Sequence, residues 1–105
     1  MTSVVRREDV ARAAAVAAQG VAGVARLSAG SGVEVSTPFA GGKVVGVRLT
    51  PTGAEVHVVV NGYDIGQVAD DVLTAVSATL TAAGVPAVVD VVVADIESAP
   101  ERRSD

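Results

Sequence analysis

Few side chains in this sequence could do acid–base chemistry, and they stand apart from one another. His57 is the only histidine, and the alternation around it places it on the outward face of a strand, beside Glu55 and Val59. A catalytic base needs a nucleophile or an orienting carboxylate within reach, and a metal ion needs further ligands. Arg48 or Glu55 could approach His57, but no other reactive side chain converges on it. The pattern therefore predicts a surface histidine with no catalytic or metal-binding role.

Two further motifs fall short of the chemistry that they suggest. Asp70 and Asp71 are consecutive in a predicted helix, so their side chains diverge by about 100° and cannot share a proton or enclose a metal ion. Gly41-Gly42-Lys43 resembles the end of a phosphate-binding loop, which needs a glycine at position 37, a Ser or Thr at 44 and a following helix. The chain has Thr37, Val44 and a strand instead. Neither motif predicts an enzyme.

Composition narrows the remaining functions. The chain has 105 residues, half of them hydrophobic and only 2% aromatic, with a formal net charge of −4. An acidic chain argues against a nucleic-acid partner, which normally needs a basic face. The lack of cysteine excludes disulfides and thiolate nucleophiles. No apolar leader or membrane-spanning run is evident, so a cytoplasmic protein without direct membrane insertion is expected.

Hydrophobic periodicity predicts two helices. The first covers about residues 8–19, with apolar positions recurring every three or four residues, and a left-handed Gly20 should end it. The second runs from Ile65 to about Ala83, with Asp64 as its N-cap and Gly84 as its stop. The expected buried stripe of the first helix is Val10, Ala13, Ala14, Ala17 and Val21. That of the second is Ile65, Ala69, Val72, Leu73, Val76, Leu80 and Ala83.

Three strands are predicted from period-two alternation and β-branched content. Residues 43–50 and 54–61 flank the turn Pro51-Thr52-Gly53 and are typical of a hairpin. Residues 87–94 are rich enough in valine for a buried strand. Crossover connections are almost always right-handed, so the third strand should run parallel to the second.

The order helix, strand, strand, helix, strand predicts a single α+β domain over residues 8–97. The expected fold is a two-layer αββαβ arrangement, with two helices packed on one face of a three-stranded mixed sheet. Residues 1–7 and 98–105 are expected to be flexible termini.

The second face of the sheet is expected to be apolar in the middle and charged at its edges, which predicts a self-association surface. Residues 28–42 are glycine-rich and should form a long loop with a brief strand at Val33–Val35. Phe39, one of two aromatic residues, lies in this loop and either plugs the core or anchors a partner. The candidate interaction residues are Phe39, Val44, Arg48, His57, Val59 and Val92.

The tetrapeptide Gly20-Val21-Ala22-Gly23 supplies an alternative hypothesis. It is a GxxG, the motif that contacts nucleic-acid backbones in KH domains, and KH type II domains resemble this chain in part of their element order. In those domains the motif lies between two helices with basic residues behind it, whereas this one ends a helix with only Arg26 nearby. The alternative is a KH-like single-stranded nucleic-acid-binding module.

Four segments together resemble the alkaline shock protein (Asp/Gls) family of bacterial envelope stress proteins. They are Gly20–Leu27 (GVAGVARL), Gly41–Leu49 (GGKVVGVRL), Ala54–Val72 (AEVHVVVNGYDIGQVADDV) and Val89–Ile96 (VDVVVADI). The aromatic–glycine pair of the family is inverted, as Gly62-Tyr63.

The resemblance implies a non-enzymatic cytoplasmic protein linked to cell-envelope stress. Such a protein would be a self-associating scaffold, held peripherally at the inner membrane face by a small membrane anchor protein. Neither the motifs nor the resemblance predicts a cofactor, a metal ion or a small-molecule ligand.

Overall fold

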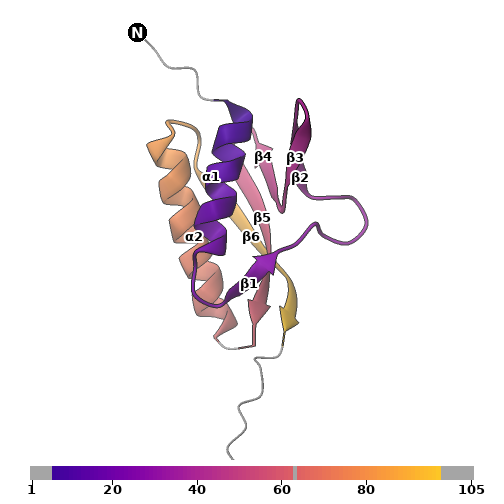
Figure 1. Cartoon of the computed structure of the whole chain (residues 1–105). Coiled ribbons are helices and arrows are strands. Elements are labelled where there is room, and N and C mark those ends of the chain that lie inside the picture. The colour runs from indigo at the N-terminus through magenta and orange to yellow at the C-terminus, as the bar shows by residue number, and fades with distance from the viewer. Residues whose placement is uncertain (1–5, 63, 98–105) are drawn as a thin grey trace, which may run out of the picture.

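The computed structural model describes residues 6–62 and 64–97 and confirms the α+β class. The helices are α1 (Arg7–Gln19) and α2 (Ile65–Ala82), and the strands are β1 (Val24–Leu27), β2 (Ser36–Phe39), β3 (Gly42–Val45), β4 (Val47–Thr50), β5 (Gly53–Asn61) and β6 (Val88–Glu97) (Figure 1). The termini predicted to be flexible lie outside the described residues, apart from Arg6 and Arg7. Arg7 already belongs to α1.

The main sheet is built around β5. Along one edge β6 runs parallel to it, from the pair Gly53↔Val88 to the pair Asn61↔Glu97, which confirms the predicted parallel orientation. The other edge is shared by two antiparallel strands, β4 beside residues 53–56 and β1 beside residues 58–60. The predicted three-stranded sheet is therefore wrong, because the described sheet is mixed but contains four strands. The prediction missed β1, whose four residues are too few to show a pattern.

Gly46 breaks the strand predicted over residues 43–50. Its φ is 93°, outside the β region, and its backbone bonds to two other segments. Its N–H donates to the carbonyl of Val35, and its carbonyl accepts from the N–H of His57. The break separates β4 from β3, which pairs with β2 in a two-stranded sheet of its own. The predicted loop of residues 28–42 thus contains a strand, at Ser36–Phe39 and not at Val33–Val35.

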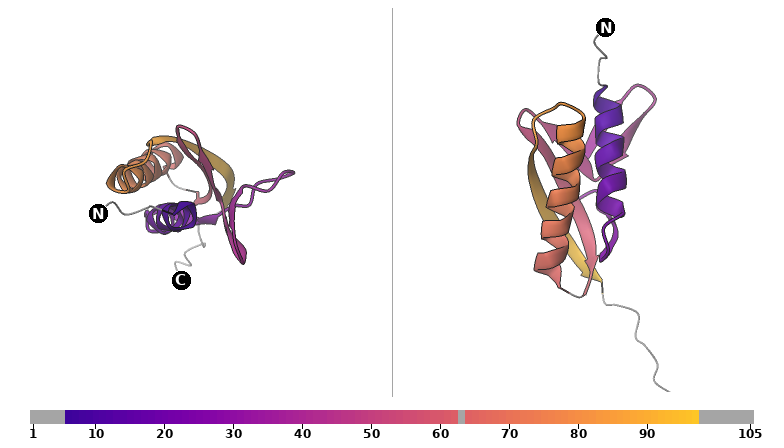
Figure 2. Two further views of the ribbon diagram at one scale, coloured as in Figure 1. Left: turned by 90° about the horizontal axis from the view of Figure 1, so that it is seen from above. Right: turned by 90° about the vertical axis from the view of Figure 1, so that its left-hand side faces the viewer.

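Both helices cover the same face of the main sheet, as predicted (Figure 2). The core between the layers is made almost entirely of valine and alanine, and Leu80 is its largest fully buried side chain. The core residues in the described part of the chain are Val10, Ala11, Ala14, Ala18, Val47, Ala54, Val56, Val58, Val60, Val68, Val72, Val76, Leu80 and Val89. Such small side chains fill the space between the layers only where helix and sheet lie close together.

The predicted helix stripes are right in part. In α2, Leu73 is 43% exposed and Val68, which was not predicted, is 6% exposed. In α1, Ala11 and Ala18 are buried instead of Ala13 and Ala17. The ends of the helices also differ from each other. Gly84, the predicted stop of α2, has a left-handed φ of 76°. The left-handed geometry predicted for Gly20 after α1 is wrong, since its φ is −76° and continues the right-handed helix.

Asp64 caps α2 as predicted, since its Oδ1 accepts a hydrogen bond of 3.1 Å from the N–H of Gln67. We expect Asp64→Ala to lower the free energy of unfolding by about 1 kcal/mol, because that N–H loses its partner. Urea denaturation measures the change. Asp70→Ala removes the same charge from the exposed side of the same helix and serves as the control. If Asp64→Ala and Asp70→Ala lowered the free energy of unfolding equally, the effect would come from the lost charge and not from the lost cap.

Candidate interaction surface

The sheet face that points away from the helices brings together Arg48, Glu55 and His57, which we call the polar cluster. Arg48 on β4 pairs in register with Glu55 on β5, and His57 follows two residues along the same strand. Arg48 Nη1 donates to Glu55 Oε1 at 3.1 Å, and His57 Nε2 lies 2.7 Å from Glu55 Oε2. The sequence predicted this proximity from alternation alone. The Glu55 carboxylate holds both neighbours.

The polar cluster also fastens residues 28–35 to the sheet. This segment projects from the side of the sheet opposite the helices (Figure 2). Arg48 Nη2 donates to the carbonyl of Glu34 at 3.4 Å, and the N–H of Val35 donates to the carbonyl of Ala29, which closes the loop. The His57 side chain is only 14% exposed. The prediction of a surface histidine is therefore wrong in its exposure, because the start of this segment lies beside His57. The N–H of Ser28 donates to the His57 carbonyl, and a Cβ on Gly30 would lie 3.9 Å from His57 Nδ1.

The chemistry available to the polar cluster is limited. Both carboxylate oxygens of Glu55 are engaged, one by Arg48 and one by His57. Among residues 6–62 and 64–97, no three His, Cys, Asp or Glu side chains are placed to hold a metal ion. The arrangement is that of a clasp between the sheet and residues 28–35.

The stability supplied by the clasp should depend on pH. The hydrogen bond with His57, followed by the charge of Arg48, holds the pKa of Glu55 below its ordinary value despite partial burial. A lowered pKa contributes stability that is present above the ordinary carboxylate pKa and lost as the pH falls through the lowered one. Glu55→Gln should therefore destabilise the fold at about pH 7, and its difference from wild type should shrink below about pH 4. Urea denaturation across this range measures the difference.

Glu34→Gln is the matched comparison for Glu55→Gln. The pKa of Glu34 is also lowered, mainly by its hydrogen bond with Lys43, whose Nζ lies 2.8 Å from Glu34 Oε2. The ion pair between Glu34 and Lys43 is exposed, so salt should screen its attraction. The polar cluster around Glu55 is more buried, and its interactions should be screened less. We expect about 0.5 M sodium chloride to remove the effect of Glu34→Gln and to leave most of that of Glu55→Gln. If salt reduced the effects of Glu34→Gln and Glu55→Gln equally, the polar cluster would not act as a buried clasp.

The other predicted interaction residues do not join the cluster. Val59 is only 3% exposed and Val92, on the neighbouring strand β6, is 38% exposed. Val44 packs against the core, so its predicted outward position is wrong. The reason is that β3 leaves the main sheet at Gly46, and the alternation of a continuous strand no longer applies.

Phe39 lies at the end of β2, away from the outer face of the sheet. Its ring is half-buried, with the guanidinium of Arg12 at 5.2 Å from the ring centroid. Two hypotheses were stated for Phe39, a core plug and an anchor for a partner. Its position argues against the core plug, and the anchor role stays a prediction. Phe39 is outside the core cluster but packs beside α1 through a cation–π contact.

A groove of about 510 Å³ separates residues 28–31 from the second half of β6. Val59 and Val92 line it together with Arg26 and Asp95. The apolar middle and charged ends expected for this face are present, but Val59 is buried, so the exposed apolar part is a strip along β6.

The sequence did not predict how open β6 is. Residues 87–94 were expected to form a buried strand, yet Val89 is its only buried residue among positions 88–97. Val88 is 60% exposed and Ile96 is 49% exposed. No described strand other than β5 pairs with β6, so its second edge, ten residues long, has no partner strand in the described part of the chain. Such an edge presents N–H and C=O groups to any strand that approaches it.

None of the helices in the described residues has both the length and the apolar character needed to cross a membrane. Comparison with family models, with curated proteins and with solved structures found no match to this chain.

Proposed function

We propose that this chain is a non-enzymatic scaffold that self-associates through β6 and serves in a bacterial envelope stress response. One observation supports the self-association above all, namely the long second edge of β6 with exposed valines beside it. The connection to envelope stress rests on the resemblance of four segments to the alkaline shock protein family.

Association would take place by addition of one strand to another. Backbone groups along the edge of β6 in one copy would pair with those of a second copy, and pockets for alternate side chains would set the register. Val88 and Val92 would then bury apolar surface on the outer face, which contributes about 25 cal/mol per Å² removed from water. Asp90 and Asp95 on the same strand are the kind of charges that limit uncontrolled edge-to-edge growth. We therefore expect a limited, reversible oligomer.

Val92→Lys tests the surface. We expect the wild-type chain to show a sedimentation coefficient that rises with concentration, and Val92→Lys to shift it toward the monomer with little change in melting temperature. Val16→Lys is the matched control, because Val16 is 66% exposed on α1 in the other layer. A strictly monomeric wild type, or an equal effect of both substitutions, would rule out association through β6.

The proposal places the protein in the cytoplasm, held at the inner membrane face by a small membrane anchor protein. The purified chain alone should not float with liposomes, whereas native cells should retain part of it in the membrane fraction. If the purified chain floated with liposomes, it would bind lipid directly, and the anchor protein would not be needed. Loss of the chain from the membrane fraction when a candidate anchor is deleted would identify that partner.

A KH-like nucleic-acid module is the alternative, and two contacts weigh against it. A Cβ on Gly23 of the GxxG would lie 2.5 Å from Cγ2 of Val68, so this glycine lets the turn pack against α2. Arg26, the nearby cation, is paired with Glu97. Titration with single-stranded RNA at low salt discriminates the two functions. Binding tighter than about 10 µM that weakens steeply with salt would favour the KH-like module over the scaffold.

A further inference from the structure

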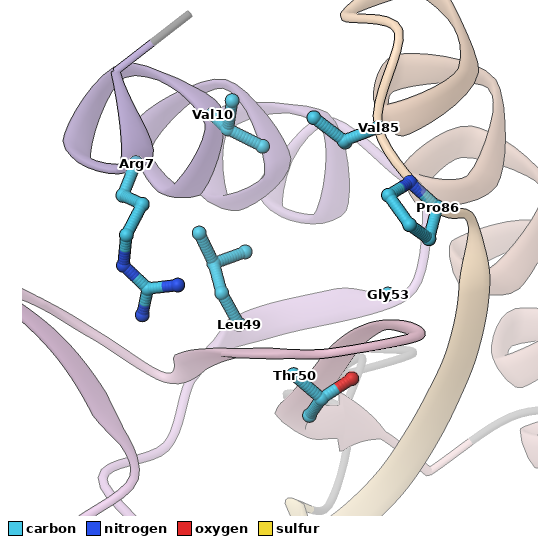
Figure 3. Close-up of a pocket in the computed structure, with 7 residues that line it drawn as sticks. All are labelled: Arg7, Val10, Leu49, Thr50, Gly53, Val85 and Pro86. Carbon is cyan, nitrogen blue, oxygen red and sulfur yellow. The ribbon is translucent and has the colours of Figure 1, made fainter.

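A cavity of about 170 Å³ lies at the end of the fold where α1 begins (Figure 3). It is bounded by the first turns of α1, the end of β4, the start of β5 and the connection between α2 and β6. The residues that line it are Arg7, Val10, Leu49, Thr50, Gly53, Val85 and Pro86. Most of these are apolar, and the site is separate from the groove and the polar cluster.

The size of the cavity sets the size of a ligand. An engineered apolar cavity of about 150 Å³ binds benzene, so this cavity can hold one six-membered ring or a chain of about six carbons. Val10 is 4% exposed and forms part of the core. Gly53 contributes no side chain that would fill the space. The walls therefore fit the apolar part of a small molecule.

Arg7 gives the cavity a charge. Its side chain extends from α1 toward β4, with the guanidinium beside Leu49 (Figure 3). Its neighbours Arg6 and Arg12 lie within ion-pair distance of Glu8 and Asp9, respectively. Within residues 6–62 and 64–97, no carboxylate lies within ion-pair distance of Arg7. A guanidinium binds a carboxylate through two parallel hydrogen bonds.

We propose that this cavity binds a small monocarboxylate that carries one apolar ring or a short alkyl chain. The carboxylate pairs with Arg7 at the rim, and the apolar part lies among Val10, Leu49 and Val85. No sequence motif predicts this site, because its residues come from four separate segments. The inference does not depend on self-association through β6.

Benzoate and hexanoate are the probes, with benzyl alcohol and acetate as the matched controls. We expect saturable changes in amide chemical shifts of the wild-type chain, centred on the lining residues, with both carboxylates. Benzyl alcohol lacks the charge and acetate lacks the apolar part, so each should bind about tenfold more weakly. No saturable shifts with either benzoate or hexanoate, or shifts centred elsewhere, would overturn the proposal.

Two variants test the role of Arg7. Arg7→Gln removes the charge from an exposed position and should reduce benzoate affinity about tenfold, to that of benzyl alcohol. Arg6→Gln makes the same change one residue earlier, outside the cavity, and should leave the affinity unchanged. Equal losses would mean that net charge alone attracts the anion, and the site would be rejected. Sedimentation of both variants should match wild type, which separates this test from that of the scaffold.

Discussion

Gly46→Ala is expected to lower the free energy of unfolding by about 2–5 kcal/mol. The backbone φ of 93° is costly for a residue with a side chain, by about 1–2 kcal/mol. A new Cβ would also lie 2.6 Å from the Cβ of Leu27, and relief of such crowding in a packed site costs about 1–3 kcal/mol more. The backbone cannot shift freely, because Gly46 bonds to both Val35 and His57.

Gly41→Ala is the matched control for this substitution. Gly41 has a nearly equal φ of 94°, but nothing lies within 4 Å of the position of its Cβ. It should therefore show only the backbone cost of about 1–2 kcal/mol. Urea denaturation of both variants measures the difference. If the two losses are the same, the contact between Gly46 and Leu27 contributes nothing to the fold.

Leu80→Ala should lower the free energy of unfolding by about 3 kcal/mol, within the usual 2–5 for a buried leucine. Leu80 is 0% exposed and is the largest side chain buried between the layers. The neighbouring core side chains are mostly valines, which are stiff about χ1 and cannot rearrange to fill the hole.

Leu73→Ala, on the same helix, is the control. It also tests which face of α2 is buried against the sheet. The sequence predicted Leu73 in the buried stripe, but its side chain is 43% exposed. We expect a loss below about 1 kcal/mol, since exposed substitutions rarely cost more. Thermal and urea denaturation give the comparison. Similar losses at both leucines would mean that the helix buries the stripe predicted from its periodicity.

Local and regular features of the fold could be predicted from the sequence. The cap at Asp64, the turn between β4 and β5 and the parallel pairing of β5 with β6 all follow from residue types or from chain handedness. The proximity of Arg48, Glu55 and His57 also followed, because alternation fixes which side chains share a face.

Features that depend on distant contacts could not be predicted. In the sequence, the alternation around Gly46 is that of a continuous strand. The strand is interrupted at Gly46 because Leu27 packs against it and its backbone bonds to Val35 and His57. The partial burial of His57 depends in the same way on where residues 28–35 lie. The predicted stripe of α2 was right at Val72, Val76 and Leu80 but wrong at Leu73. Its polar and small residues leave the apolar stripe broad, so Val68 and Leu73 compete for burial.

The composition of the core has a consequence for the entropy of folding. Alanine loses no side-chain rotamers on burial, and valine, with one stiff torsion, loses few. Described core residues include no aromatic side chain and no methionine, so each buries less apolar area than a larger residue would. The smaller gain from burial is offset by a smaller loss of conformational freedom. In such a domain, the close fit of many small side chains, and not the size of a few large ones, fixes how the helices lie on the sheet.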